Sequence, residues 1–408
     1  MRSLFLRFAG FTSAPILSAL APFIILPVVS RIVGDAGWAN FSAGQSIGIL
    51  GMVAILFGWG VIGPVRVARA RDKSSRVAIL RESLRSRLLL SLVAIPVVAI
   101  VTWIVCTDAY RVESVAVAVA MATAGLSPAW YCIGEGNPRG VMLYDALPKL
   151  TASAVAFPIL ALSGQVLWYP IVLAIVTLPS FAAHAWKTLK RHPVPHEAPR
   201  ALRHVMRSLL PTAAIDATGN AYGSTAIPIA TAGLEPTDAS AFASADRAYR
   251  IGTLAVVAVA NAFQAWVLEP VPGNPRRRHL AALGVHATLA LLGGVAIAVL
   301  GPWATGLVFG TDVAARPVPS LLFGVAFFAI CLATPLIRNL LVPAGRYKTV
   351  LAATICAAAA GVSVMLFGSW IGSEVVVAAG VATSEIVALA VLALPALSEF
   401  RRLPRALA

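Results

Sequence analysis

Four ionisable side chains lie inside otherwise apolar segments of the chain, where a charge is expensive. Asp216 lies about ten residues into one such segment, and Asp246, Arg247 and Arg250 follow in the next. A charged side chain at the centre of a bilayer costs about 2.5–3.5 kcal/mol or more if it faces lipid. We therefore expect these side chains to face protein or water, and to bind a charged ligand or one another.

Two interpretations of these charges remain open. In the first, a static ion pair sets the register of the helices, either Asp246–Arg250, which are four residues apart and share a helix face, or Asp216–Arg250. In the second, the side chains line a water-filled cavity and bind an anionic headgroup. At 1.5 Å per helical residue, Asp216 and Arg250 lie ~15 Å and ~18 Å from opposite membrane faces, near the midplane. Because arginine presents a planar fork suited to bidentate phosphate binding, and a structural pair needs only one arginine per carboxylate, Arg247 would remain available.

Three uncharged polar residues extend the same candidate cavity. Asn220 follows Asp216 by one helical turn, and Asn261 and Gln264 continue the segment that carries Arg250. Asn261 and Gln264 could extend a polar track towards the cytoplasm.

Two further charges stand alone in apolar surroundings. Arg31 lies at the end of the first apolar segment, where it could extend to the membrane interface or contribute to the cavity. Glu385 lies near the middle of the last segment, as a candidate site for a coupling proton or ion or as a hydrogen-bonding partner between packed helices.

The elements that must position these side chains are membrane-spanning helices. The chain is 59% hydrophobic and only 12% charged, and about 20 mostly apolar residues suffice to span a bilayer. We predict about twelve spans, at 9–32, 40–64, 88–106, 113–134, 141–163, 166–186, 206–230, 239–268, 281–301, 318–341, 349–369 and 374–397. The predicted fold is an all-α polytopic membrane protein with two six-helix bundles around a central cavity.

The distribution of positive charge predicts the orientation of these spans. Of the 32 Lys and Arg residues, 27 lie at or near one side of the predicted membrane, whereas Arg111 and Arg316 lie in opposite loops that are otherwise acidic. By the positive-inside rule, both termini are expected in the cytoplasm. The net charge of +15 therefore indicates contact with anionic membrane lipids and not with nucleic acid.

A basic, proline-containing linker divides the chain. We predict an N-terminal bundle at 1–190, a cytoplasmic linker at 191–205 and a C-terminal bundle at 206–408. At an offset of 201 residues, Leu26-Pro27 aligns with Ile227-Pro228 and Phe41 with Phe242, a faint repeat of the kind seen in two-bundle transporters.

Several functions lack support in the sequence. No P-loop, HExxH or GxSxG motif occurs, so we predict that the chain is not an enzyme. The four cysteines show no CxxC spacing, and His192 and His196 have no acidic or cysteine partner nearby. We expect no metal and no cofactor.

Four stretches resemble the Wzx-type O-antigen and exopolysaccharide flippases of the multidrug/oligosaccharidyl-lipid/polysaccharide exporter superfamily. In the run Ser127–Leu150, the similar positions are Pro128, Trp130, Tyr131, Gly134 and Lys149. The opening run Leu20–Ile47 resembles the first two helices of that family, with Arg31 and Gly34 before the turn, and 308–312 and 342–349 resemble later loops.

The resemblance implies a flippase of the bacterial cytoplasmic (inner) membrane that moves undecaprenyl-diphosphate-linked oligosaccharide repeat units to the external leaflet by alternating access. It also implies a polysaccharide polymerase and chain-length machinery as partners. An ion-coupled drug or cation antiporter of the same superfamily is the alternative, although a cationic drug favours a more acidic cavity than this one. A lipid II flippase usually has two further spans, and a membrane-bound polymerase usually has a large external loop.

Overall fold

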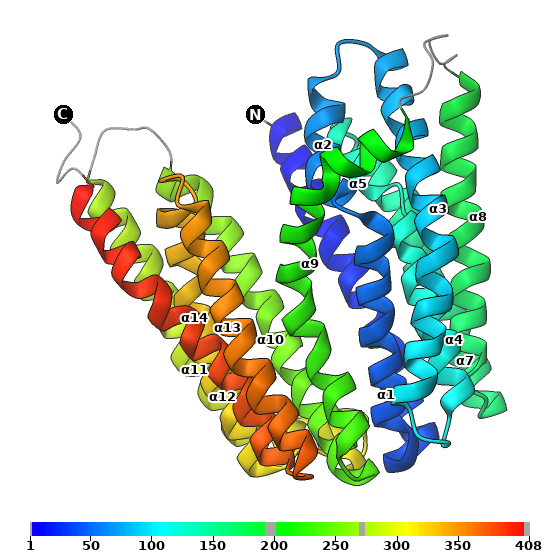
Figure 1. Cartoon of the computed structure of the whole chain (residues 1–408), viewed down its shortest axis with the longest axis vertical. Helices are drawn as coiled ribbons and strands as arrows, with labels where there is room; N and C mark the ends of the chain where they lie inside the picture. The colour runs from blue at the N-terminus through cyan, green and yellow to red at the C-terminus, as the bar shows by residue number, and fades with distance from the viewer. Residues whose placement is uncertain (1, 192–200, 269–273, 404–408) are drawn as a thin grey trace. The chain divides into compact units, whose positions relative to one another are not determined.

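The computed structural model consists of helices joined by short connections (Figure 1). It describes the backbone of residues 2–191, 201–268 and 274–403. Within these ranges, side chains are described except at 2–23, 191, 215, 219–222, 265 and 268. The described ranges contain no β-strand, as predicted for an all-α protein.

Each of the twelve predicted spans lies mainly on helical segments. In the first half these are α1 (Arg2–Leu56), α2 (Trp59–Arg69), α3 (Lys73–Val105), α4 (Arg111–Ala122), the 3-10 turn η1 (Thr123–Leu126), α5 (Ala129–Gly134), α6 (Pro138–Val141), the π-helical turn η2 (Met142–Ala146), α7 (Leu147–Ser163) and α8 (Trp168–Arg191). In the second half they are α9 (Leu202–Gly233), α10 (Pro236–Leu268), α11 (Pro275–Phe309), the 3-10 turn η3 (Thr311–Val313), α12 (Pro317–Pro335), the π-helical turn η4 (Leu336–Leu341), α13 (Tyr347–Trp370) and α14 (Glu374–Arg402).

Nine stretches of the described residues are long and apolar enough to cross a membrane. They are Ile24–Arg69, Lys73–Val105, Arg111–Gly134, Pro138–Ser163, Trp168–Lys190, Pro275–Phe309, Pro317–Leu341, Tyr347–Trp370 and Glu374–Arg402. The other three predicted spans lie on the first part of α1, on α9 and on α10, each of which includes residues without described side chains. The chain is thus an all-α multi-pass membrane protein.

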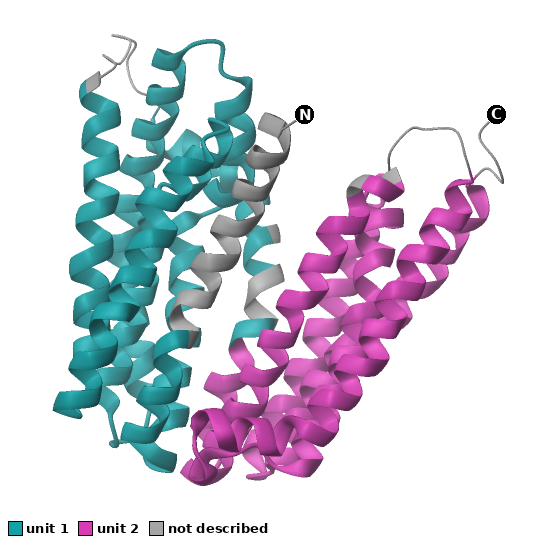
Figure 2. Ribbon diagram, turned by 180° about the vertical axis from the view of Figure 1, so that it is seen from behind, with its two compact units in different colours: residues 1–224 teal, residues 225–408 magenta. Residues whose placement is uncertain are grey.

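The helices form two compact units, residues 1–224 and 225–408 (Figure 2). The boundary falls inside α9, because the first half of that helix packs in unit 1, where Leu209 and Val205 join a buried cluster with Trp59 and Trp130. The sequence-based division lies earlier, in the linker at 191–205. Residues 192–200 of that linker lie outside the described residues, and its last residues begin α9.

Several spans are interrupted, and side chains bind the backbone groups that these breaks leave without helical partners. Gly34 adopts a left-handed φ of 58° and separates the first two spans within α1. Between α4 and α5 the chain passes through η1, and Arg87 of α3 donates from Nη1 to the carbonyl oxygens of Gly125 (3.0 Å) and Ser127 (2.9 Å). A membrane interior offers no water to satisfy such groups, so the fully buried Arg87 stabilises this break.

Small residues allow α1 to approach α4 closely. Gly44 and Gly48 lie one turn apart on α1, and both face the backbone of α4. A Cβ atom added at Gly48 would lie 2.5 Å from the carbonyl oxygen of Ala118, so only glycine fits there. Close packing of this kind is a main source of helix association in membranes, where apolar burial contributes little.

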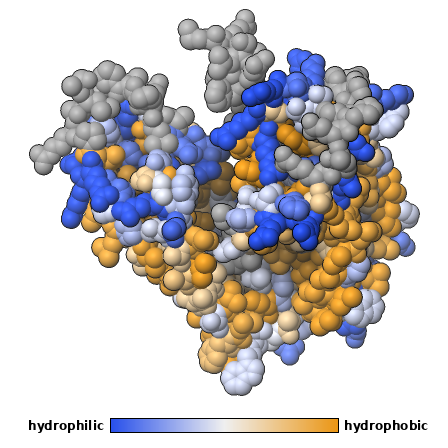
Figure 3. All heavy atoms as spheres, turned by 45° about the horizontal axis from the view of Figure 1, so that its top comes forward, coloured by the Kyte–Doolittle hydropathy of each residue, from blue (hydrophilic) through white to orange (hydrophobic). Residues whose placement is uncertain are grey.

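Basic residues lie at one end of each unit. Arg66, Arg69, Lys73 and Arg203 mark this end in unit 1, and Figure 3 shows hydrophilic residues gathered at the helix ends that face the viewer, with hydrophobic residues on the flanks. The carboxylate of Asp72 caps α3 by accepting from the Ser75 amide (2.6 Å), and this bond lowers the pKa of Asp72.

In unit 2 the basic end carries Arg276–Arg278, Arg346, Lys348 and Arg402. The opposite ends carry few basic residues, and two of them, Arg111 in unit 1 and Arg316 in unit 2, are paired with Asp108 and Asp238. The charge asymmetry expected from the sequence is therefore present within each unit.

We predict that Gly48→Leu lowers the thermal stability of the chain, because the added side chain would collide with α4. Overpacking in a close-packed core typically costs about 1–3 kcal/mol. Thermal unfolding of the detergent-solubilised chain measures the effect. The matched control is Gly284→Leu in α11, where an added Cβ meets nothing within 4 Å. Equal melting temperatures for the two variants would contradict this account of α1–α4 packing.

Candidate functional site

The centre of the candidate site is an ion pair within α10. Arg250 donates from Nε to Oδ2 of Asp246 (2.5 Å) and from Nη2 to Oδ1 (3.1 Å), so the guanidinium meets both carboxylate oxygens. The Asp246 residue is 1% exposed, whereas the side chain of Arg250 is 29% exposed. The spacing of four residues predicts that Asp246 and Arg250 share a helix face, and in the structure the two side chains form an ion pair.

The sequence of α10 explains why the pair is buried. Alanine, serine and one phenylalanine occupy positions 239–245, and every residue from 239 to 247 is buried. Small side chains let neighbouring helices pack closely around α10, which excludes solvent from Asp246. An unpaired carboxylate would be very costly there, and the ion pair with Arg250 offsets part of that cost.

Arg247 differs from Arg250 in exposure. It is only 7% exposed, so it is buried in the protein and does not lie open to solvent. Two guanidinium groups and one carboxylate thus lie within five residues of α10, and Arg250 is the more accessible of the two arginines.

Glu385 lies opposite α10, on α14, and the two helices are joined through Tyr249. The Tyr249 hydroxyl donates to Oε1 of Glu385 (3.0 Å), and both residues are buried. The ring of Tyr249 also contacts Phe323 of α12, with ring centroids 5.6 Å apart. The Tyr249–Glu385 bond is a hydrogen bond between packed helices, which is one of the two roles that the sequence suggested for Glu385. The other role, as a site for a coupling proton or ion, stays a prediction.

Asn261 and Gln264 follow Arg250 on α10, and the polar track that they could form stays a prediction. Asn261 is exposed and accepts a hydrogen bond at Oδ1 from Nη1 of Arg338 (2.7 Å), which lies in the π-helical turn η4. Gln264 is half-buried on the same helix. The sequence did not single out Arg338, because it counts among the 27 basic residues at one side of the predicted membrane.

The remaining candidates lie in unit 1. Arg31 is exposed, and its Nη1 donates to the Pro27 carbonyl (2.9 Å), one turn back in α1. Asp216 is half-buried on α9, and the side chain of Asn220 lies outside the described residues. An Asp216–Arg250 contact would join the two units and stays a prediction, as does the cavity role of Arg31.

A second buried polar group, in unit 1, was not identified as such from the sequence. Asp145 in η2 accepts from Oγ of Ser127 (2.6 Å) and pairs with Lys149 (2.9 Å), four residues later. Both partners belong to the run that resembles the flippase family, and the Asp-x-x-x-Lys spacing was a visible signal. The pair joins α7 to the break before α5 and so has a structural role.

No metal centre emerges among the residues that the structure describes. They include no group of three or more His, Cys, Asp and Glu side chains placed to hold an ion. Cys106, Cys132 and Cys331 are buried free thiols, and Cys356 is an exposed one.

Neither a protein-family model nor a curated protein sequence matches this chain. Several solved structures, in contrast, match this chain. A multidrug resistance MATE family transporter of the MOP superfamily, in its inward-facing conformation, gives a TM-score of 0.60 at 15% identity, over 95% of this chain and 98% of that one. The lipid II flippase MurJ, in an inward closed conformation, gives 0.66 at 10% identity, over 98% and 89%. A MATE structure in the bent conformation gives 0.53 at 15% identity, over 95% and 97%.

The fold of this chain is therefore that of the MATE and MurJ membrane transporters. Identities of 10–15% carry the likeness no further than the fold.

We predict that Tyr249→Phe destabilises the chain. The substitution keeps the ring packed against Phe323 but leaves the buried Glu385 oxygen without this donor, a loss of about 1–3 kcal/mol. Thermal unfolding in detergent measures it, with Tyr347→Phe as the control, because Tyr347 is 64% exposed at the start of α13. An unchanged melting temperature for Tyr249→Phe would show that this bond does not stabilise the packing of α10 on α14.

Proposed function

We propose that this protein is a flippase that moves undecaprenyl-diphosphate-linked oligosaccharide repeat units from the cytoplasmic to the external leaflet of the bacterial inner membrane. It would act by alternating access and supply surface polysaccharide biosynthesis, together with a polysaccharide polymerase and chain-length machinery. The fold shared with the MATE and MurJ structures supports a role in membrane export. The resemblance of the sequence to the Wzx-type flippases supports the lipid-linked repeat unit as the substrate.

The observation that carries the proposal is the pair of arginines on α10. Arg247 and Arg250 lie in the middle of a long helix in a membrane protein, with a single carboxylate, Asp246, beside them. Residues 246–250 of α10 thus carry two guanidinium groups and one carboxylate. The planar guanidinium fork suits the phosphate oxygens of an anionic headgroup.

A diphosphate cannot cross hydrocarbon unaided, because a single buried, unpaired charge already costs several kcal/mol after relaxation. Fixed guanidinium groups would lower this cost at mid-depth, while the isoprenoid tail remains in lipid. Arg250 holds both oxygens of Asp246 in the structure, and in the proposed mechanism phosphate oxygens compete with Asp246 for the same planar fork. The Asp246–Arg250 ion pair would then form again when the headgroup leaves.

An ion-coupled drug or cation antiporter is the second candidate, and the buried carboxylates Asp246 and Glu385 favour it. The MATE structures above are multidrug transporters by name. An antiporter for cations would use the carboxylates to bind its substrate, so loss of Asp246 should abolish it while loss of Arg250 should not.

We predict that Arg250→Ala abolishes export and that Arg250→Lys impairs it substantially, because lysine keeps the charge but lacks the bidentate fork. The measurement is the amount of surface polysaccharide, together with accumulation of lipid-linked repeat units in the inner leaflet. The control is Arg277→Ala, which removes an exposed arginine at the basic end of unit 2. Parental export by Arg250→Ala, at normal protein abundance, would refute the anionic-headgroup mechanism.

Both termini are proposed to lie in the cytoplasm. Reporter fusions at Arg71 and Gly345, in connections at the basic ends of the two units, should report a cytoplasmic location. Fusions at Asp108 and Asp312 should report an external one, because translocated loops carry few basic residues. A cytoplasmic signal at Asp312 would overturn the twelve-span topology.

A further inference from the structure

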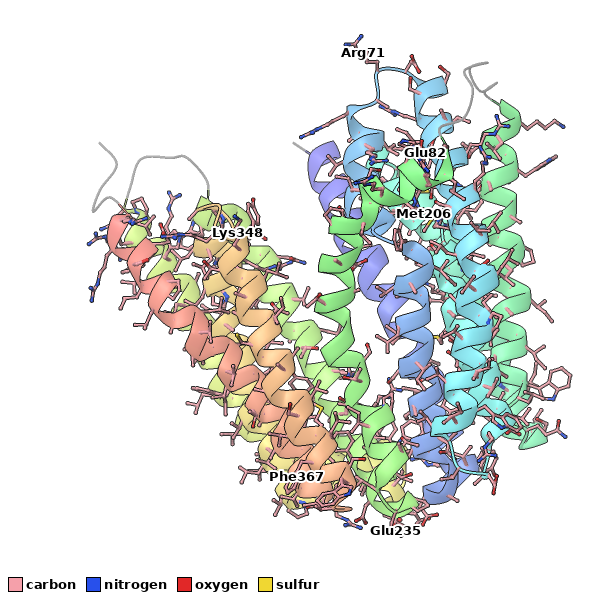
Figure 4. All side chains as sticks on the ribbon, in the orientation of Figure 1. Arg71, Glu82, Met206, Glu235, Lys348 and Phe367 are labelled. Atoms are coloured by element: carbon pink, nitrogen blue, oxygen red, sulfur yellow. The ribbon has the colours of Figure 1, made fainter. Side chains whose placement is uncertain are left out.

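A pocket of about 430 Å³ lies in unit 2, at the end opposite to its basic residues. It is formed where α10, α12 and α14 begin, next to the turn at Glu235 that Figure 4 labels. Its polar lining is Asp238, Arg316, Ser373 and Glu374, and its apolar wall includes Val318 and Pro319. The volume falls within the ~300–1,000 Å³ typical of small-molecule sites.

The polar groups of this pocket form an ordered array. Arg316 forms ion pairs with Asp238, at 2.6 Å between Nη2 and Oδ1, and with Glu374, at 3.3 Å between Nη1 and Oε2. The Glu374 side chain is 3% exposed, whereas those of Asp238 and Arg316 are 26% and 48% exposed. Glu374 is therefore a buried anchor that fixes the guanidinium, and the accessible groups are one carboxylate and one guanidinium side by side.

Glu374 also has unused hydrogen-bonding capacity. Its Oε1 is buried and has no hydrogen-bond partner among the described residues, although the residue lines the pocket. A buried acceptor without a donor destabilises the protein, so a ligand donor that reached Oε1 would be stabilised there.

The charges of the pocket are nearly balanced. Two carboxylates face one guanidinium, and the N-termini of α10, α12 and α14 add partial positive charge at the same end of the unit. Neither a cation nor an anion is therefore strongly selected. Carboxylates only accept hydrogen bonds and a guanidinium only donates them, so the pocket suits a ligand whose groups both donate and accept.

Neighbouring hydroxyl groups of a sugar meet this requirement. One hydroxyl can donate to Asp238 and the next can accept from Arg316, while the C–H face of the ring packs on Val318 and Pro319. We infer that this pocket binds an uncharged saccharide unit. The inference rests on the proposed function, in which this end of unit 2 faces the side to which the oligosaccharide is delivered.

The test is saturation-transfer NMR on the full chain in detergent, with the methyl glycosides of D-glucose, D-galactose, D-mannose and N-acetyl-D-glucosamine as probes. At least one probe should bind the parent protein. Val318→Trp fills the pocket from its exposed wall without touching the ion cluster and should weaken binding by about tenfold or more. Leu321→Trp is the control, because Leu321 is 54% exposed on the same helix and does not line the pocket.

Arg316→Lys keeps the charge but loses the planar fork, so it should also weaken binding while thermal unfolding confirms that the variant is folded. The inference is overturned if no glycoside binds the parent protein, or if Val318→Trp binds as the parent does. Export by Arg250→Ala is measured separately. If Arg250→Ala loses export but the parent protein binds no glycoside, only the saccharide pocket is rejected. If Arg250→Ala exports normally and the parent protein binds a glycoside, only the proposed transport mechanism is rejected.

Discussion

The structure depends on how a buried charge is neutralised where no water can solvate it. Among the described residues, four carboxylates are buried in the helices, and each has a cationic or hydroxyl partner beside it. Lys149 pairs with Asp145, Arg250 with Asp246 and Arg316 with Glu374, and the Tyr249 hydroxyl bonds Glu385. Two of these pairs are local, at a spacing of four residues, so a helix forms them as soon as it folds. The other two join different helices and so also fix how those helices pack.

Broken helices raise the same difficulty with backbone groups. Spans that pass through 3-10 or π-helical turns leave carbonyl oxygens without their usual partners, and polar side chains from neighbouring helices bind them. Arg87 does this for the break after α4. At η4, a ring nitrogen of His279 lies 3.2 Å from the Asn339 carbonyl oxygen. The breaks therefore persist because the surrounding side chains compensate for them, and one of them places Arg338 within reach of Asn261.

The proposed transport centres on α10, where Asp246, Tyr249 and Arg250 lie within five residues. In the proposed mechanism, competition for the Arg250 fork would take place beside the Tyr249–Glu385 bond that joins α10 to α14. The saccharide pocket lies at the beginning of the same helix, through Asp238. Headgroup and sugar would thus be recognised along a single element, with charge chemistry at its middle and neutral hydrogen bonding at its end.

The sequence by itself determined the fold class, the spans and the charge asymmetry, because each depends on local composition. An apolar run of about 20 residues is a helix in a membrane wherever it packs, and Arg-rich and Lys-rich loops mark one side of it. The Asp246–Arg250 pair belongs with these features, since a spacing of four residues implies a shared face.

Only the tertiary structure decided which distant residues meet. The Arg316–Glu374 pair spans 58 positions and the Tyr249–Glu385 bond spans 136, and nothing in local spacing indicates either. The sequence likewise gave no sign that Arg247 is buried whereas Arg250 is partly exposed, because exposure depends on the helices packed around α10. The role of Gly48 also became visible only with the backbone of α4 beside it. Contacts of this kind are set by the arrangement of whole helices, and that arrangement is a property of the folded chain.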